Sequence, residues 1–111
     1  CEQYRKDLID AVAGQYVILI TARPDKYKKA TLDSISCKCN KWQPNESYFN
    51  DMNLPPATIK KTILERFVFP KHGDGPYFGI ESNPKTRIMY AKNKIESVGY
   101  AEFITGRTWA P

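Results

Sequence analysis

The sequence has no long hydrophobic run and no segment typical of secretion. Its longest uninterrupted apolar stretch, residues 16–20, has five residues, whereas a membrane-spanning helix needs ~20. The chain does not open with a basic segment followed by an apolar one, which is the pattern of a signal peptide. We therefore expect a cytoplasmic protein with no membrane partner.

Cysteine and histidine are scarce, with three cysteines and one histidine. An odd cysteine count is not typical of a disulfide framework. Cys37 and Cys39, together with Cys1 and His72, could supply four zinc ligands. Structural zinc, however, usually takes its ligands from tight Cys-x-x-Cys-type pairs, and here two of the candidates are isolated. We expect reduced thiols near a helix end and an exposed histidine in a loop.

Basic residues outnumber acidic ones, 17 to 12, which gives a formal net charge of +5 over 111 residues. This length suits one small domain, and a hydrophobic content of 41% is enough for a core. The positive charge permits a phosphate-bearing or nucleic-acid partner. There is no arginine-rich run and no aromatic RNA-binding signature, and the densest basic groups are residues 26–29 and 60–61. A nucleic-acid-binding domain that uses these two groups remains one alternative.

Hydrophobic periodicity and turn residues predict alternating helices and strands. Two helices are predicted in the first half, Glu2–Ala13 followed by Gly14, and Asp25–Ile35 capped by Asp25. A third helix opens at Pro55 and Pro56, and its inward side chains are Ile59, Ile63, Leu64 and Phe67. A fourth is capped by Ser82 or Asn83, and its inward side chains are Ile88, Met89 and Ile95. The predicted strands are Tyr16–Ile20, ended by Thr21–Pro24, then a short one near Ser47–Asn50, Tyr77–Ile80 and Tyr100–Thr105. A loop is predicted over Phe69–Pro76, because it contains two prolines and two glycines.

This alternation predicts an α/β fold with an open, mostly parallel sheet and helices on both faces. Ligands bind such sheets beyond the carboxyl ends of the strands. Two segments qualify as candidate sites, since 21–23 follows the first predicted strand and 81–84 follows the strand at 77–80. Thr, Ser and Asn at these junctions are also ordinary helix caps, and this alternative stays open.

Three segments carry a family resemblance. In the first segment, Val17–Pro24, an apolar strand ends in Thr followed by Ala-Arg. The second, Pro55–Leu64, has a lysine near the start of a helix. In the third, Tyr77–Tyr90, an acidic residue ends a strand and is followed by a helix with a Met-Tyr pair. In order and spacing they resemble the second, third and fourth motifs of the haloacid dehalogenase superfamily of phosphohydrolases. The resemblance covers residues 17–95. It implies a Rossmann-like three-layer sandwich, with residues 1–111 as a single domain or the C-terminal part of one.

The resemblance also implies roles for individual residues. Thr21 would donate its hydroxyl, and Ala22 its backbone N–H, to a phosphoryl oxygen, with Arg23 in the same phosphate-binding segment. Lys60 would neutralise charge on the nucleophile and the phosphate, or its neighbour Lys61 if the register is shifted by one. Glu81 would help to hold Mg²⁺, directly or through water. Phosphoryl transfer depends on positioning and charge stabilisation, which a hydroxyl, an ammonium and a metal can supply.

The sequence departs from the family pattern in two ways. The first motif, an Asp-x-Asp that supplies the nucleophile and the acid/base, is absent, and Asp7 and Asp10 fall on a predicted helix with no strand before it. The fourth motif commonly has two acidic residues, whereas Ser82 follows Glu81 here, and one carboxylate holds Mg²⁺ more weakly than two. We expect the first strand and its nucleophile to lie outside these residues. The alternative is a catalytically inactive relative.

The sequence thus predicts a Mg²⁺-dependent phosphate monoester hydrolase, or a fragment of one. Its partner would be a phosphorylated small molecule, such as a nucleotide, or a nucleic-acid end, in keeping with the basic charge. The alternative is an inactive module that serves as a structural or binding component of a larger assembly.

Overall fold

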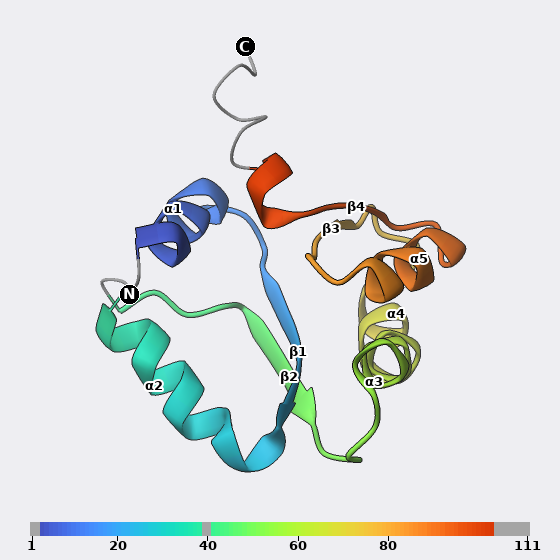
Figure 1. The fold of residues 1–111 in the computed structure, drawn as a ribbon, viewed down its shortest axis with the longest axis horizontal. Coiled ribbons are helices and arrows are strands. Elements are labelled where there is room, and N and C mark those ends of the chain that lie inside the picture. Colours follow the sequence, from blue (N-terminus) through green and yellow to red (C-terminus); the bar gives the residue numbers. More distant parts are fainter. Residues whose placement is uncertain (1–2, 39–40, 104–111) are drawn as a thin grey trace. The chain divides into compact units, whose positions relative to one another are not determined.

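The structure, a computed structural model, describes residues 3–38 and 41–103, and the side chains of residues 8–37 and 41–103. Helices and strands alternate, which confirms the predicted α/β class, and the strands form two short parallel sheets (Figure 1). The elements are α1 (Gln3–Val12), β1 (Ile18–Pro24), η1 (Asp25–Tyr27), α2 (Lys28–Lys38), β2 (Glu46–Asn50), α3 (Pro56–Ile63), η2 (Leu64–Val68), α4 (Phe69–His72), β3 (Phe78–Ile80), α5 (Pro84–Lys92) and β4 (Glu96–Val98).

The chain forms two compact units, Cys1–Asn53 and Leu54–Pro111. Each contains one β-α-β arrangement, with β1 parallel to β2 in the first unit and β3 parallel to β4 in the second. The single sheet that was predicted to contain both β1 and β3 is not observed in the described part of the chain, where the two strands belong to different two-stranded sheets. No helix in the described residues is long and apolar enough to cross a membrane.

In the first unit, β1 is longer than the hydrophobic run predicts. It starts at Ile18 and continues through Thr21 to Pro24, so the prediction that Thr21–Pro24 ends the strand was wrong. The reason is the partner strand: Pro24 lies opposite Asn50 of β2, after a register shift that follows Ile20. Proline is tolerated at such a strand end because its missing N–H need not join the ladder. Thr21 therefore lies within a strand.

The connection from β1 to α2 also differs from the prediction. Asp25 is the first residue of the 3₁₀ turn η1 and not a helix cap, since the N-cap position is Pro24, which makes no side-chain cap hydrogen bond. Helix α2 then runs to Lys38, three residues beyond the predicted end at Ile35. The short strand predicted near Ser47–Asn50 is confirmed as β2.

The buried helix of the second unit begins as the prolines predict. Pro55 is the N-cap residue and Pro56 opens α3, because proline needs no hydrogen-bonded N–H in the first turn of a helix. The apolar side chains Ile59, Ile63 and Leu64 are 1%, 2% and 3% exposed. This confirms the first three positions of the predicted stripe.

The end of this helical segment differs from the sequence pattern. Phe67 is 47% exposed, and Val68 is buried in its place. The segment Leu64–Val68 is π-helical. A π-helix has a wider turn than an α-helix, so the residue on the same face as Ile63 is the fifth after it, Val68, and not the fourth, Phe67. The chain then continues as α4, where a loop was predicted, and the loop begins only at Gly73, whose φ of 68° favours glycine.

Helix α5 begins as predicted, and two of the three side chains predicted to be inward, Met89 and Ile95, are buried, although Ile95 lies beyond the end of the helix. Asn83 is its N-cap. The buried residues are Thr86, Met89 and Tyr90, whose spacing places them on one helical face. Ile88, predicted to be inward, is 56% exposed, because it lies about 100° around the axis from Met89.

The last predicted strand, Tyr100–Thr105, is also wrong in the described residues. The strand is β4, whose three residues match the three of β3. Tyr100–Phe103 is helical, with the Phe103 N–H donating to the Gly99 carbonyl at 3.0 Å. Residues 104–105 of the prediction lie outside the described residues.

Candidate functional site

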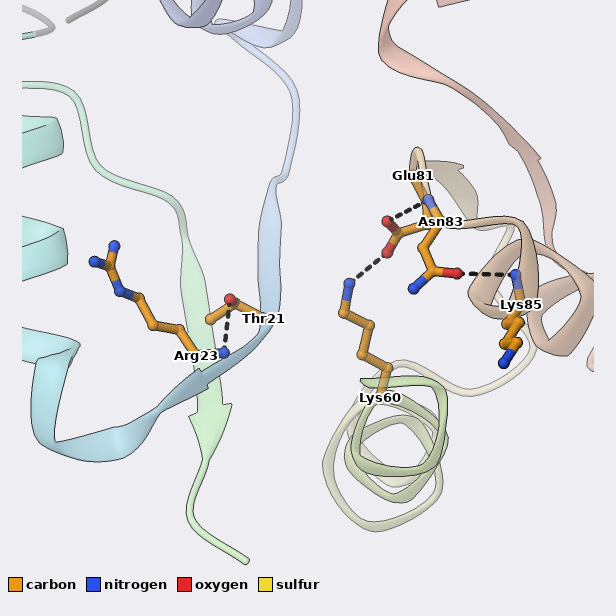
Figure 2. A network of polar contacts seen from close by, with 6 residues as sticks. All are labelled: Thr21, Arg23, Lys60, Glu81, Asn83 and Lys85. Carbon is orange, nitrogen blue, oxygen red and sulfur yellow. Dashed lines mark hydrogen bonds and ion pairs between the residues drawn. The ribbon is translucent and has the colours of Figure 1, made fainter. Parts of the chain in front are cut away.

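The candidate site is built around an ion pair between Lys60 and Glu81 in the second unit. Lys60 lies on α3 next to the fully buried Ile59, and Glu81 directly follows β3. The Lys60 ammonium donates a hydrogen bond to Oε1 of Glu81, and the two side chains are only 12% and 14% exposed (Figure 2). Charges this buried are stable only when they are paired and hydrogen-bonded. The pair thus fixes both groups at the carboxyl end of β3.

Further contacts hold the Glu81 carboxylate in one orientation. Its Oε2 accepts the backbone N–H of Asn83 at 3.1 Å, and the Glu81 N–H donates to the Val98 carbonyl of β4 at 2.8 Å. Asn83 in turn accepts the Lys85 N–H at 3.0 Å through Oδ1 as the cap of α5 (Figure 2). The start of α5 and the end of β3 are therefore joined through the carboxylate.

Tyr90 is a member of this site that the sequence analysis did not assign, although it noted the Met-Tyr pair. The side chain is 8% exposed. A methyl group added at Gly79 would lie 3.2 Å from the ring, so glycine in β3 permits this close packing. Burial, and then the negative charge of Glu81, raise the pKa of Tyr90 to about 12. Tyr90 thus supplies a neutral hydroxyl near the ion pair, and its place on the buried face with Thr86 is the signal that would have found it.

Only one of the two adjacent lysines belongs to the site. Neighbouring residues on a helix point about 100° apart, and Lys61 is exposed whereas Lys60 is mostly buried. The contact with Glu81 therefore places Lys60, and not Lys61, in this candidate site.

The other predicted site residues, Thr21, Ala22 and Arg23, lie in β1 of the first unit. Thr21 is half-buried, and its Oγ1 accepts the Arg23 N–H at 3.1 Å (Figure 2). This is a local turn-like contact of the kind threonine makes without any ligand. Arg23 is exposed and Ala22 is half-buried. That these residues meet Lys60 and Glu81 around one phosphate stays a prediction.

The first unit contains one carboxylate at the start of β2, Glu46, that is held by two tyrosine hydroxyls. Glu46 accepts hydrogen bonds from the hydroxyls of Tyr16 at 2.6 Å and Tyr48 at 2.5 Å. The hydrogen bond to Glu46, and then burial, raise the pKa of Tyr48 to about 12. These three residues were not singled out as a site, and their contacts join the start of β2 to the segment before β1.

The residues around Glu81 do not by themselves fit a magnesium ion. Within the described residues there is no group of three or more His, Cys, Asp or Glu side chains that could hold a metal. Both oxygens of Glu81 already accept hydrogen bonds, whereas Mg²⁺ requires an octahedral set of oxygen ligands.

The candidate zinc ligands do not form a metal-binding group in the described residues either. Cys37 is exposed on α2, and His72 is a half-buried residue of α4 rather than an exposed loop residue, because the helix continues past the predicted loop start. Cys1 and Cys39 lie outside the described residues.

Comparison of the chain with protein-family models, with curated proteins and with solved structures finds no match.

Proposed function

We propose that this chain is the phosphate-binding part of a haloacid-dehalogenase-like, Mg²⁺-dependent phosphate monoester hydrolase. The observation that carries the proposal is the ion pair of Lys60 and Glu81. The two residues are 21 positions apart and come from the segments that resemble the third and fourth family motifs. That resemblance selects the same two residues as neighbours of one phosphoryl group.

Each residue has a defined task in the proposal. The Lys60 ammonium neutralises negative charge on the phosphoryl group, while Thr21 and the Ala22 N–H donate hydrogen bonds to a phosphoryl oxygen, with Arg23 beside them. Such preorganised donors stabilise the charge that develops in the transition state. Magnesium, when bound, supplies further neutralisation of phosphoryl oxygens. Both oxygens of Glu81 already accept hydrogen bonds, so a magnesium ion here would need further carboxylates from outside the described residues.

The sheets support a strand supplied from outside the described residues. Parallel sheets are normally covered on both faces and contain more than two strands. In the part of the chain that the structure describes, β1 pairs only with β2 and β3 only with β4, so each of β1 and β3 has an edge to which a strand can be added. The family's first strand, which ends in the nucleophilic Asp-x-Asp, is the strand that the resemblance implies.

The substrate in this proposal is a nucleotide or the phosphorylated end of a nucleic acid, in keeping with the net charge of +5. The competing proposal is an inactive module of a larger assembly, which is favoured by the absence of any Asp-x-Asp in the 111 residues.

Hydrolysis of p-nitrophenyl phosphate and of a 3′- or 5′-phosphorylated oligonucleotide, with Mg²⁺ and with EDTA, tests the proposal. The natural polypeptide that contains residues 1–111 is the protein to use. We expect Mg²⁺-dependent release of phosphate, and Lys60→Ala and Thr21→Ala should each lower kcat/KM by about 100-fold or more. Lys61→Ala is the matched control and should retain the parent rate. No phosphate release from any of these substrates would favour the inactive module.

A further inference from the structure

The turn that joins β1 to α2 forms an exposed surface that is both basic and aromatic. All residues from 23 to 30 are exposed, and Tyr27 at its centre is 43% exposed. Four cations belong to this surface, Arg23, Lys26, Lys28 and Lys29. An aromatic ring surrounded by cations is thus presented to solvent.

The two cations nearest the ring, Arg23 and Lys26, lie over it. The Arg23 Cζ lies 5.5 Å from the centroid of the Tyr27 ring, and the Lys26 Nζ lies 5.2 Å from it, both within the range of a cation–π contact. Lys29 differs, since it pairs with Asp33 at 2.8 Å. Within the described residues, neither Arg23 nor Lys26 forms an ion pair with a carboxylate. Two positive charges are therefore held beside one exposed ring.

We propose that the surface formed by residues 23–29 binds a single strand of nucleic acid. In the complex, Arg23 and Lys26 turn from the Tyr27 ring to the phosphodiester groups, which Lys28 also contacts. An unpaired base then stacks on the ring. Proteins that bind single strands combine these two elements, aromatic stacking platforms and a positively charged track along the backbone.

The composition of the surface favours nucleic acid over other anionic partners. A membrane surface would need apolar side chains to insert, and the only aliphatic residues of 23–30 are Pro24 and Ala30. An acidic protein would be bound by the lysines alone, with no use for an exposed ring between two cations. Stacking on the Tyr27 ring is a contact that the planar bases of a single strand make and that carboxylate side chains and lipid headgroups do not.

This inference rests on the proposed function for its substrate. Arg23 follows Thr21 by two residues on β1, so a nucleic-acid strand bound here would place its phosphorylated end at the proposed phosphate-binding segment. Binding of the strand itself requires no hydrolysis. The two proposals can therefore fail separately.

Fluorescence anisotropy of a labelled 12-nucleotide single strand without terminal phosphate, added to the 111-residue chain, tests the surface. We expect Tyr27→Leu to weaken binding about tenfold, because stacking on the aromatic ring is lost. Tyr16→Leu is the control, since Tyr16 is a tyrosine of the same unit that is 58% exposed, and it should bind like the parent. Lys26→Gln should lower the slope of log affinity against log salt by about one, and Lys92→Gln, an equal change of charge elsewhere, should not.

Heparin, a polyanion without bases, separates stacking from charge. We expect Tyr27→Leu to leave heparin binding unchanged while weakening that of the oligonucleotide. Equal binding of the oligonucleotide by the parent and Tyr27→Leu, equal losses for both ligands, or tighter binding to vesicles of phosphatidylserine than to the oligonucleotide would overturn the proposal. Loss of binding in Tyr27→Leu together with no phosphatase activity would retain the surface and reject the proposed function.

Discussion

The ammonium of Lys60 on α3 and the carboxylate of Glu81 after β3 form a largely buried ion pair that joins a helix to a strand end. Removing one partner leaves the other charge buried and unpaired, which costs more than losing an exposed pair. This relationship allows the site to be tested by stability measurements that need no substrate.

We expect Lys60→Met to lower the free energy of unfolding by about 3 kcal/mol, because the Glu81 carboxylate loses its cationic partner. Lys61→Met, on the exposed neighbour, should change it by less than about 0.5 kcal/mol. Urea unfolding of the 111-residue chain measures both. The double variant Lys60→Met/Glu81→Leu should be more stable than the sum of the two single changes predicts. Strict additivity would show that the pair is not coupled.

Magnesium binding to the 111 residues alone should be weak, with a Kd of ~1 mM or higher, because Glu81 is a single carboxylate whose oxygens are already engaged. Isothermal titration calorimetry measures the affinity. A micromolar Kd would mean that other carboxylates gather around Glu81, and Asp25, Asp51 and Asp74 would be the first to replace by Asn.

Thr86→Val should raise the free energy of unfolding by about 1 kcal/mol. Thr86 is 0% exposed, and its hydroxyl has no hydrogen-bond partner among the described residues, so the protein bears the desolvation of a polar group without compensation. Valine has a similar shape and a similar helix propensity. Thermal unfolding checks the change. Thr62→Val is the matched control, since its hydroxyl donates to the Thr58 carbonyl at 2.9 Å, and it should bring no stabilisation. A destabilised Thr86→Val would reveal a partner for that hydroxyl.

Tyr90 should make the protein less stable at alkaline pH. Burial and the Glu81 charge raise its pKa from 10 in the unfolded chain to about 12 in the folded one, so its contribution is fully present below pH 10 and is lost as the pH rises through 12. When the pH is raised from 10 to 12, we expect the free energy of unfolding of Tyr90→Phe to fall by about 2 kcal/mol less than that of the parent. Urea unfolding at a series of pH values compares the two slopes. Below pH 9 the two curves should run parallel, and parallel curves up to pH 12 would contradict the prediction.

Local sequence chemistry was sufficient at the starts of α3 and α5 and at the end of α1. Pro55 and Pro56 open α3, Asn83 caps α5 with its own side chain, and Gly14, with a φ of 88°, follows α1. In each case the signal and the structure lie within a few residues of each other. The α/β alternation could be predicted for the same reason, since it sums local periodicities.

Features that depend on distant partners could not be predicted in this way. Continuation of β1 to Pro24 depends on the pairing with Asn50 of β2. Exposure of Ile88 and Phe67 depends on which side of each helix meets the rest of the second unit. Periodicity shows that a helix has an apolar face, but the packing partner decides which residues form it.

In the candidate site, too, some features follow from the local sequence and others depend on distant partners. The sequence by itself determined that Glu81 follows a strand, and the helical angle between Lys60 and Lys61 determined that only one of them can face inward. Only the tertiary structure decided that this lysine is Lys60, that its partner is the Glu81 carboxylate, and that Tyr90 lies beside them. The physical reason is that an ion pair between residues 21 positions apart forms only when the packing of α3 and α5 brings the helix and the strand end together.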